Sequence, residues 1–217
     1  MEEKITNPYV KLLAVTQPAN DLSLSFGNAE GLIEFAGRLC YDSTRKMGDD
    51  RNWIEKRVRQ GHESILEHAS ASFLIVCSRA VSHELVRHRF SSFSQRSQRY
   101  VSESKMNFIY PEDIVMDKTL DKQEMFSKAM KSSWDNYRNL LKMGVSKESA
   151  RYVLPNACVT ELVMTMNFRE LRHFIEVRMD PKAMTEMRNI AGQVFKICCS
   201  LSPQIFKNIV NMEDMQE

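Results

Sequence analysis

Hydrophobic residues recur every three to four positions over several stretches of the chain, and this spacing predicts helices. The clearest helix is 122–143, where an apolar stripe ends at Gly144, a residue suited to the left-handed turn after a helix. Ser146 is expected to cap a short helix that ends before Pro155. Further helices are predicted at 29–41, at 51–60 before Gly61, at 168–178, at 181–200, and around Val81, Leu85 and Val86.

The sequence also predicts where the last helices begin and which segments form strands. Asp180 is expected as the N-cap of helix 181–200, with Pro181 in its first position, and Ser202-Pro203 repeats that start for a last helix. Two short apolar runs, 69–77 and 158–166, predict buried strands. How the strands pair cannot be read from the pattern. Because no repeat or linker interrupts the chain, we expect one domain over 1–217.

The composition is that of an ordinary soluble globular protein, with 43% hydrophobic and 27% charged residues. A net charge of +2 argues against a general nucleic-acid coat or membrane-surface binder, so any anion binding must be local. No run approaches the roughly 20 apolar residues of a membrane span, and the acidic start lacks a signal peptide. Five cysteines without paired spacing indicate reduced thiols in the cytoplasm. Methionines at helical spacing are interpreted as core residues: Met125, Met130, Met184 and Met187.

The segment 87–100 carries the most chemistry. Its cations are arginine and histidine without lysine, and serines, glutamines and aromatic residues lie between them. Arginine forks match phosphate and carboxylate oxygens, and aromatic faces pack on rings, so the segment predicts a phosphorylated, planar ligand. If Arg87–Arg89 lie on a helix, their side chains are about 100° apart and cannot all grip one small anion. A surface shared by two ligands or two subunits would suit that arrangement.

Several common sites are missing from the sequence. None of its seven glycines forms a dinucleotide-binding or P-loop motif. His83 and His88 are five residues apart and would not face one metal ion, and His62 and His68 give no support either, so no metal site is expected. The cysteines lie in apolar runs and are expected to be inert. Ser97 has no local base, so its hydroxyl is expected to form hydrogen bonds and not to attack.

Arg87-His88-Arg89 followed by seven residues and Ser97 resembles the R-H-R-x7-S motif of the flavin-dependent thymidylate synthases. The resemblance extends over about residues 10–210, and further motifs in the same order are similar to 61–68, 150–156 and 167–178. It implies a methyltransferase that converts dUMP to dTMP with 5,10-methylenetetrahydrofolate as carbon donor, FAD relaying hydride from NADPH, and no enzyme cysteine as nucleophile. It also implies a cytoplasmic homotetramer whose active sites are shared between subunits. The fold we expect is α+β, with a small, largely antiparallel central sheet flanked by long helices.

The resemblance also assigns site residues. FAD would contact His62, Ser64, Arg87, His88, Arg89, Gln95, Asn167, Arg169 and His173. The nucleotide dUMP would contact Glu84, Arg87, Gln95, Arg96, Ser97, Gln98, Arg99, Arg151 and Arg178. The catalytic residues would be Ser97 and Arg178. The guanidinium of Arg178 would favour the activated, deprotonated uracil, because it stabilises negative charge without losing its own proton.

Two positions depart from the commonest pattern of the family. Many members carry an acid where this chain has Gln95, which we interpret as variation within a subfamily. Arg96 replaces a small or aliphatic residue, and its charge is expected either to strengthen phosphate binding or to pair with an acid of a neighbouring subunit.

Two other functions are compatible with the same residues. Arginines among Phe90, Phe93 and Tyr100 could bind single-stranded nucleic acid, although the low net charge and the absence of an RNA-binding motif argue against it. The third hypothesis is a flavoprotein of this fold that has lost synthase activity.

Overall fold

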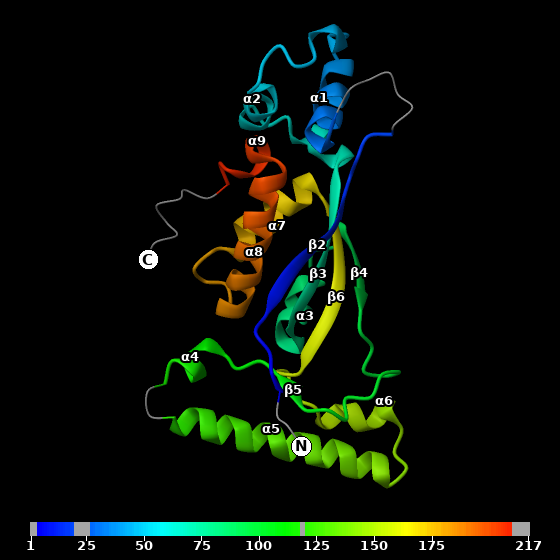
Figure 1. The fold of residues 1–217 in the computed structure, drawn as a ribbon, viewed down its shortest axis with the longest axis vertical. Helices are drawn as coiled ribbons and strands as arrows, with labels where there is room; N and C mark the ends of the chain where they lie inside the picture. The colour runs from blue at the N-terminus through cyan, green and yellow to red at the C-terminus, as the bar shows by residue number, and fades with distance from the viewer. Residues whose placement is uncertain (1–3, 20–26, 118–119, 210–217) are drawn as a thin grey trace.

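The protein has an α+β fold in which helices surround a four-stranded antiparallel sheet of order β2-β3-β6-β4 (Figure 1). The computed structural model describes residues 4–19, 27–117 and 120–209, so the acidic residues 1–3 lie outside it. The sheet strands are β2 (Tyr9–Val15), β3 (Ser70–Ser78), β4 (Ser91–Gln95) and β6 (Val159–Asn167). A separate parallel pair joins β1 (Lys4–Ile5) to β5 (Asn107–Phe108).

The helices occupy one face and both ends of the sheet. The longer ones are α1 (Ala29–Leu39), α2 (Trp53–Arg59), α3 (Arg79–Leu85), α5 (Asp121–Lys142), α7 (Phe168–Arg178) and α8 (Thr185–Leu201). Short helices and 3-10 turns connect them: η1 (Thr44–Lys46), η2 (Glu63–His68), α4 (Glu112–Val115), α6 (Lys147–Ala150), η3 (Arg151–Val153) and α9 (Pro203–Phe206). Helices α1 and α2 lie at one end of the sheet, and α5 crosses the opposite end (Figure 1).

The strand register places the buried side chains on one face of the sheet. In β3 and β6, Phe73 lies opposite Met164 and Ile75 lies opposite Leu162, and all four are at most 1% exposed. Strand side chains alternate between faces, so this side packs in one cluster with α7 and α8. The opposite face carries partly exposed residues such as Ser72, which is hydrogen-bonded to Thr165, its cross-strand partner.

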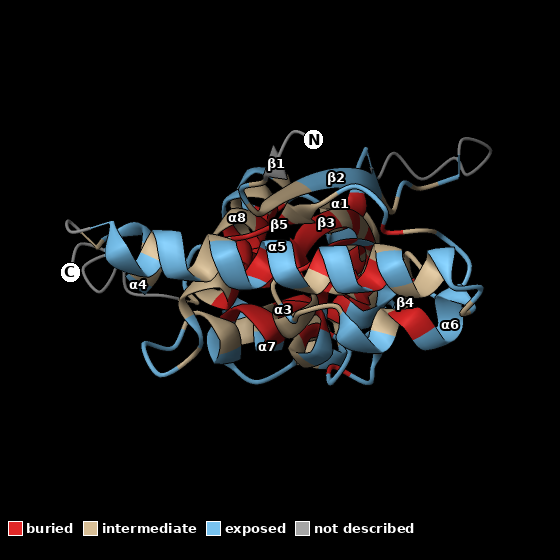
Figure 2. Ribbon diagram, turned by 90° about the horizontal axis from the view of Figure 1, so that it is seen from below, coloured by how far each residue is buried: buried red, intermediate tan, exposed pale blue. Residues whose placement is uncertain are grey.

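Helix α5 is an amphipathic cover for the end of the sheet and for the loop after β4. Its outer side is largely exposed (Figure 2), whereas Trp134 and Tyr137 are fully buried. The Trp134 Nε1–H donates to the Glu103 carbonyl at 2.9 Å, and the Tyr137 hydroxyl accepts the Glu103 N–H at 3.2 Å. Arg138 adds a hydrogen bond to the Ser104 carbonyl at 2.9 Å. These contacts tie the chain between β4 and β5 to a rigid helix.

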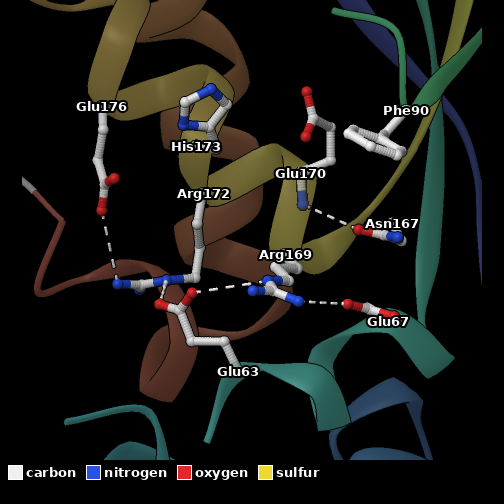
Figure 3. A pocket seen from close by; sticks show the side chains of 9 residues that line it. All are labelled: Glu63, Glu67, Phe90, Asn167, Arg169, Glu170, Arg172, His173 and Glu176. Atoms are coloured by element: carbon white, nitrogen blue, oxygen red, sulfur yellow. Dashed lines mark hydrogen bonds and ion pairs between the residues drawn. The ribbon is translucent and has the colours of Figure 1, made fainter. Parts of the chain in front are cut away.

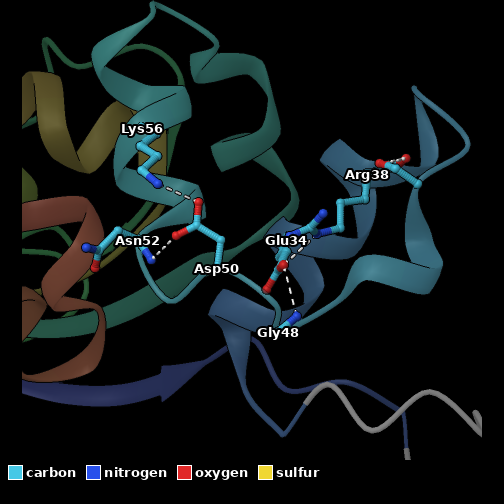
Figure 4. A network of polar contacts seen from close by, with 7 residues as sticks. Glu34, Arg38, Gly48, Asp50, Asn52 and Lys56 are labelled. Carbon is cyan, nitrogen blue, oxygen red and sulfur yellow. Dashed lines mark hydrogen bonds and ion pairs between the residues drawn. The ribbon is translucent and has the colours of Figure 1, made fainter.

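Helices α1 and α2 are joined by close packing at a glycine. A Cβ built on Gly37 of α1 would lie 2.4 Å from the Trp53 ring of α2, so only glycine allows this approach. The Arg38 guanidinium lies over the same ring at 4.9 Å and pairs with Glu34 at 2.6 Å. Glu34 also accepts the Gly48 N–H at 3.2 Å (Figure 4), which fixes the loop between the two helices.

The elements predicted from the sequence agree well with the longest helices and strands of the structure. Helix 122–143 is confirmed as α5 and helix 168–178 as α7, and the runs 69–77 and 158–166 form β3 and β6. Gly61 and Gly144 adopt the positive φ angles expected after α2 and α5, +81° and +85°. Ser146 caps α6 by accepting the Ser149 N–H.

The expected start of helix 181–200 is wrong, and the structure differs from the sequence pattern in two further respects. Helix α8 begins at Thr185, because the Asp180 carboxylate accepts the Lys182 N–H at 2.8 Å and so forms a local turn. The condition that Arg87–Arg89 lie on a helix is not met, because α3 ends at Leu85 and the chain turns to enter β4 beside β6. Strands β2 and β4 are not predicted by the pattern: β4 (Ser91–Gln95) has a single apolar residue.

The methionine interpretation is half correct. Met130 and Met187 are buried, whereas Met125 is 76% exposed and Met184 is 38% exposed. Their helical spacing alone did not reveal which helix face is turned to solvent. In the described part of the chain, no helix is both long and apolar enough to cross a membrane.

Candidate active site

One face of α7 carries three residues that are four positions apart: Glu170, Phe174 and Arg178. Residues at i, i+4 and i+8 lie along one side of a helix. His88, from the turn after α3, lies against this side, with its ring centroid 5.1 Å from that of Phe174. Its Nδ1 is 3.1 Å from Glu170 Oε1 and its Nε2 is 3.0 Å from Arg178 Nε. The imidazole is therefore held between the two ends of α7.

Arg178 is fixed by three hydrogen bonds to elements distant in sequence. Its Nε–H donates to His88, and its Nη1 donates to the Glu84 carboxylate at 2.8 Å. Its Nη2 donates to the Glu84 carbonyl at 3.0 Å. The side chain is 17% exposed, so the planar cation is largely shielded from water but not sealed off. The structure thus brings Glu84, His88 and Arg178 together, as expected for residues of one site.

His88 is kept neutral by its surroundings. Burial lowers its pKa below the usual 6.5; the nearby Arg178 charge acts in the same direction, whereas the hydrogen bond to Glu170 opposes it. The ring can therefore accept a hydrogen bond from Arg178 at neutral pH.

A cavity of about 530 Å³ opens beside this cluster, between η2 and α7 (Figure 3). Its lining consists of Glu63, Glu67, Phe90, Asn167, Arg169, Glu170, Arg172, His173 and Glu176. Asn167 caps α7 by accepting the Glu170 N–H at 2.8 Å. Three residues predicted for FAD, Asn167, Arg169 and His173, therefore share one cavity, and His88 lies next to it with its ring 6.0 Å from that of His173.

The lining of this cavity holds four carboxylates and two arginines, and three of the carboxylates form ion pairs with these arginines. Arg169 pairs with Glu67 at 2.6 Å, and Arg172 lies 3.6 Å from Glu63 and 3.7 Å from Glu176 (Figure 3). Because each of these carboxylates has a cationic partner, the cavity is not a purely acidic site.

Exposed aromatic and basic groups of residues 87–90 fit a planar, phosphate-bearing cofactor. Phe90 is 83% exposed and offers an aromatic face. The Arg87 and Arg89 side chains are exposed, and within the described residues no hydrogen bond or ion pair occupies them. Both arginines are therefore free to bind an anion, and Arg89 directly precedes Phe90, which lines the cavity.

Another cavity, of about 270 Å³, is lined by hydrogen-bond donors. Arg79, His83, Gln98 and Arg151 contribute to it, and none of the described residues in its lining is acidic. Gln98 is only 9% exposed, and its Nε2 has no hydrogen-bond partner in the described part of the chain. Arg151 is partly held by the Glu148 carbonyl at 3.2 Å. A buried donor without an acceptor, among three basic side chains, suits a small anion.

Four further residues predicted for the nucleotide, Gln95, Arg96, Ser97 and Arg99, lie at the end of β4 or just after it and are engaged within the chain. Gln95 donates to the Thr160 hydroxyl at 3.1 Å, and Ser97 Oγ accepts the Arg99 N–H at 3.2 Å. Arg96 lies 3.6 Å from the buried Glu103 of its own chain, and its side chain is 35% exposed. Arg99 pairs with Glu148 at 3.1 Å, and both side chains are about half exposed.

Sequence reasoning missed part of both cavities. His62 and Ser64 are exposed in and next to η2 but do not line the larger cavity, whereas their neighbours Glu63 and Glu67 do. Also missed were Phe90, Glu170, Arg172, Glu176, Arg79 and His83. The sequence contains two acids four residues apart, Glu63 and Glu67, and two arginines three residues apart, Arg169 and Arg172. That these acids and arginines pair becomes apparent only from the tertiary contact between η2 and α7.

No described cysteine lines either of these two cavities, although Cys158 lies beside Gln98 and Arg79 of the smaller one. Cys77 and Cys158 are buried, and burial raises the pKa of each thiol to about 12. Burial also raises the pKa of the Cys198 thiol, while Cys40 is exposed. Among the described residues there is no group of three or more histidines, cysteines or acids that could hold a metal ion.

Comparison with known proteins identifies the family. The family described as "Thymidylate synthase complementing protein" matches residues 22–204. A flavin-dependent thymidylate synthase of Geobacter sulfurreducens is 39% identical over 188 residues, which cover 82% of this chain and 81% of the relative. One of Mycolicibacterium gilvum is 36% identical over 223 residues, covering 92% and 88%. This chain belongs to the flavin-dependent thymidylate synthase family. The resemblance inferred from its motifs is confirmed.

As a flavin-dependent thymidylate synthase family member, the chain is a methyltransferase. Its fold also occurs in a solved structure, the UMP/dUMP methylase PolB from Streptomyces cacaoi bound with 5-Br dUMP. The TM-score is 0.79, and the alignment covers 94% of this chain and 95% of the other. At 23% identity this likeness establishes the shared fold.

Proposed function

We propose that the chain catalyses the reductive methylation of dUMP to dTMP. The observation that carries the proposal is the cluster in which Arg178 binds both Glu84 and His88, residues 94 and 90 positions away in the chain. It assembles three of the residues expected around the pyrimidine and the flavin, next to a cavity that fits a cofactor.

The pyrimidine is placed against Arg178. A guanidinium fixed by three hydrogen bonds presents a permanent positive charge, and a fixed charge stabilises the negative charge of an ionised uracil more effectively than a mobile one. Glu84 and His88 hold the cation in place and thereby orient it.

The phosphate of the nucleotide is placed in the smaller cavity. Gln98 and Arg151 were expected to contact dUMP, and the cavity adds Arg79 and His83 to them. The unpartnered Gln98 Nε2 supplies a hydrogen-bond donor that a phosphate oxygen would satisfy.

FAD is assigned to the larger cavity, with Asn167, Arg169 and His173 as donors, and the exposed Arg87 and Arg89, which precede the lining residue Phe90 in the chain, are expected to reach its phosphates. Bound FAD would supply the hydride, taken from NADPH, and methylenetetrahydrofolate would supply the one-carbon unit. The carboxylates that now pair with Arg169 must release it for this contact, while Phe90 offers a face for a ring.

The proposal needs no cysteine nucleophile. Cys77 and Cys158 are buried with pKa values of about 12, so neither provides a thiolate at neutral pH, and no cysteine lines either described cavity. We further propose a cytoplasmic homotetramer with sites shared between subunits. The division of the predicted nucleotide residues between the Glu84–Arg178 pair and the smaller cavity supports this arrangement.

The test is an absorbance spectrum of the purified protein, followed by anaerobic NADPH reduction with dUMP and methylenetetrahydrofolate. A flavin spectrum is expected, with dTMP formed only when both substrates are present. Arg178→Ala should abolish dTMP formation, whereas Arg59→Ala, at an exposed position of α2, should not. A colourless protein that takes up no added FAD would reject the proposal. Salt-sensitive binding of single-stranded RNA by such a protein would favour the nucleic-acid hypothesis.

A further inference from the structure

We propose that Glu170 is a positioning residue that acts through His88 on the guanidinium of Arg178. Its carboxylate fixes the tautomer and orientation of the imidazole, and the imidazole then holds Arg178 in the geometry that faces the pyrimidine. The inference rests on the proposed function, because it takes Arg178 as the group that contacts uracil. Glu170 itself touches neither Arg178 nor the position assigned to the pyrimidine.

The hydrogen bonds around His88 leave one arrangement of its protons. Arg178 Nε–H is a permanent donor, because a guanidinium keeps its proton in proteins. It lies 3.0 Å from His88 Nε2, so Nε2 is the acceptor and carries no proton. The neutral ring then carries its proton on Nδ1, which donates to Glu170 Oε1 at 3.1 Å. His88 is therefore the Nδ1–H tautomer.

This tautomer is the less common one for a free imidazole, so it needs a partner to select it. Glu170 is the acceptor that does so, and its side chain is only 11% exposed. The His88 side chain is 6% exposed and that of Arg178 is 17% exposed. Contacts so far removed from water are weakly screened, so each strongly constrains its neighbour. The other rings facing His88 are Phe174 at 5.1 Å and His173 at 6.0 Å.

A structural role for Glu170 is the obvious alternative. It occupies the third position of α7, where an acid commonly binds back to the N-cap backbone or complements the helix dipole. Here Asn167 provides the cap by accepting the Glu170 N–H, while the Glu170 carboxylate is directed to His88. An acid that only stabilised the helix start would have no effect on the tautomer of a histidine from another element.

The first test reads the tautomer directly. Protein labelled with ¹⁵N in its five histidines is studied by solid-state NMR, and the His88 signals are assigned from their loss in His88→Gln. Wild type should show a protonated Nδ1 and an unprotonated Nε2. Glu170→Ala should give a mixture of tautomers or the Nε2–H form. Glu170→Gln should retain the Nδ1–H form, because its amide oxygen still accepts the proton. Glu176→Gln, which removes the same charge from the same helix without contacting His88, should leave these signals unchanged.

The second test reads the consequence for the nucleotide. Glu170→Ala should lower kcat/KM for dUMP about tenfold, the loss expected when one hydrogen bond to a charged group is disturbed. Glu170→Gln should retain most of the wild-type kcat/KM for dUMP. If Glu170→Ala fails to fold, Glu170→Gln and the wild-type tautomer still decide the question.

The outcomes separate this inference from the proposed function. A wild-type His88 protonated on Nε2 overturns the positioning role whatever the enzyme does. Normal dUMP turnover in Glu170→Ala also overturns it, while leaving the synthase proposal intact. The Nδ1–H tautomer in a protein that forms no dTMP would preserve the Glu170–His88–Arg178 geometry and reject the synthase proposal.

Discussion

The buried thiols give a simple test of chemistry at the residue scale. Burial raises the pKa of Cys77 and Cys158 to about 12, so they remain protonated at pH 8 and should not react with iodoacetamide in the native protein. Cys40 is exposed and should be alkylated first. Peptide mapping should locate the label at Cys40, with dTMP formation unchanged. Loss of activity that follows alkylation of Cys77 or Cys158 would contradict a mechanism without a cysteine nucleophile.

His88 predicts how stability depends on pH. Its pKa is lowered in the folded protein, chiefly by burial, whereas in the unfolded chain it is about 6.5. As the pH falls below 6.5, the unfolded chain binds a proton that the folded protein does not, so the free energy of unfolding decreases down to the folded pKa. Above pH 6.5 this contribution is constant.

The measurement is urea unfolding between pH 7.5 and 5 for wild type and His88→Gln. Comparison with the variant isolates His88 from buried acids such as Glu103 and Glu186, whose raised pKa values act in the opposite direction near their own titration. Wild type should lose stability more steeply below pH 6.5 than the variant. Parallel curves would show that His88 is not neutralised by its surroundings.

Single residues of the site were predictable only where a motif named them. Arg178 and His88 were expected in one site, and they are hydrogen-bonded. Glu63 and Arg172 were not assigned, because their pairing depends on how η2 packs against α7 and no local pattern encodes it. Arg96 shows another limit of sequence reasoning: its contact with Glu103, seven residues later, depends on how the loop after β4 folds back, which no local pattern encodes.

At the scale of elements, two glycines give a matched pair of predictions. Gly37→Ala should destabilise the protein by about 1–3 kcal/mol, because its Cβ would lie 2.4 Å from the Trp53 ring and force α1 and α2 apart. Gly192→Ala should stabilise it by about 0.5–1 kcal/mol, since Gly192 lies inside α8 with no atom within 4 Å of the new methyl group. Urea midpoints at one protein concentration measure both. A destabilised Gly192→Ala, or a neutral Gly37→Ala, would contradict the packing described.

The elements that could be predicted are those whose side chains repeat a burial pattern. Helix α5 was predicted because Met130, Trp134 and Tyr137 form a stripe that is buried in the structure. Strand β4 was missed because it is an edge strand whose only apolar residue is Phe93. Its place in the sheet comes from pairing with β6. Antiparallel pairing between segments about 70 residues apart is a tertiary property that local hydrophobic spacing does not contain.

At the scale of the whole molecule, the residues assigned to dUMP fall into separate groups. Arg178 and Glu84 belong to the cluster at the larger cavity, while Arg151 and Gln98 line the smaller one. The two cavities have no lining residue in common. A nucleotide site completed by two copies of the chain would bring one group from each subunit, which agrees with the proposed homotetramer.

Subunit complementation tests this arrangement. Arg178→Ala and Arg151→Ala should each be inactive alone, because each lacks one half of every site. When the two variants are co-expressed in equal amounts and assemble at random, a shared site receives both intact arginines in roughly a quarter of cases, so about that fraction of wild-type activity should return. Mixed oligomers are isolated with two different affinity tags, and dTMP formation is measured. If each chain holds a complete site of its own, no mixed oligomer contains an intact site, and activity stays at the level of the single variants.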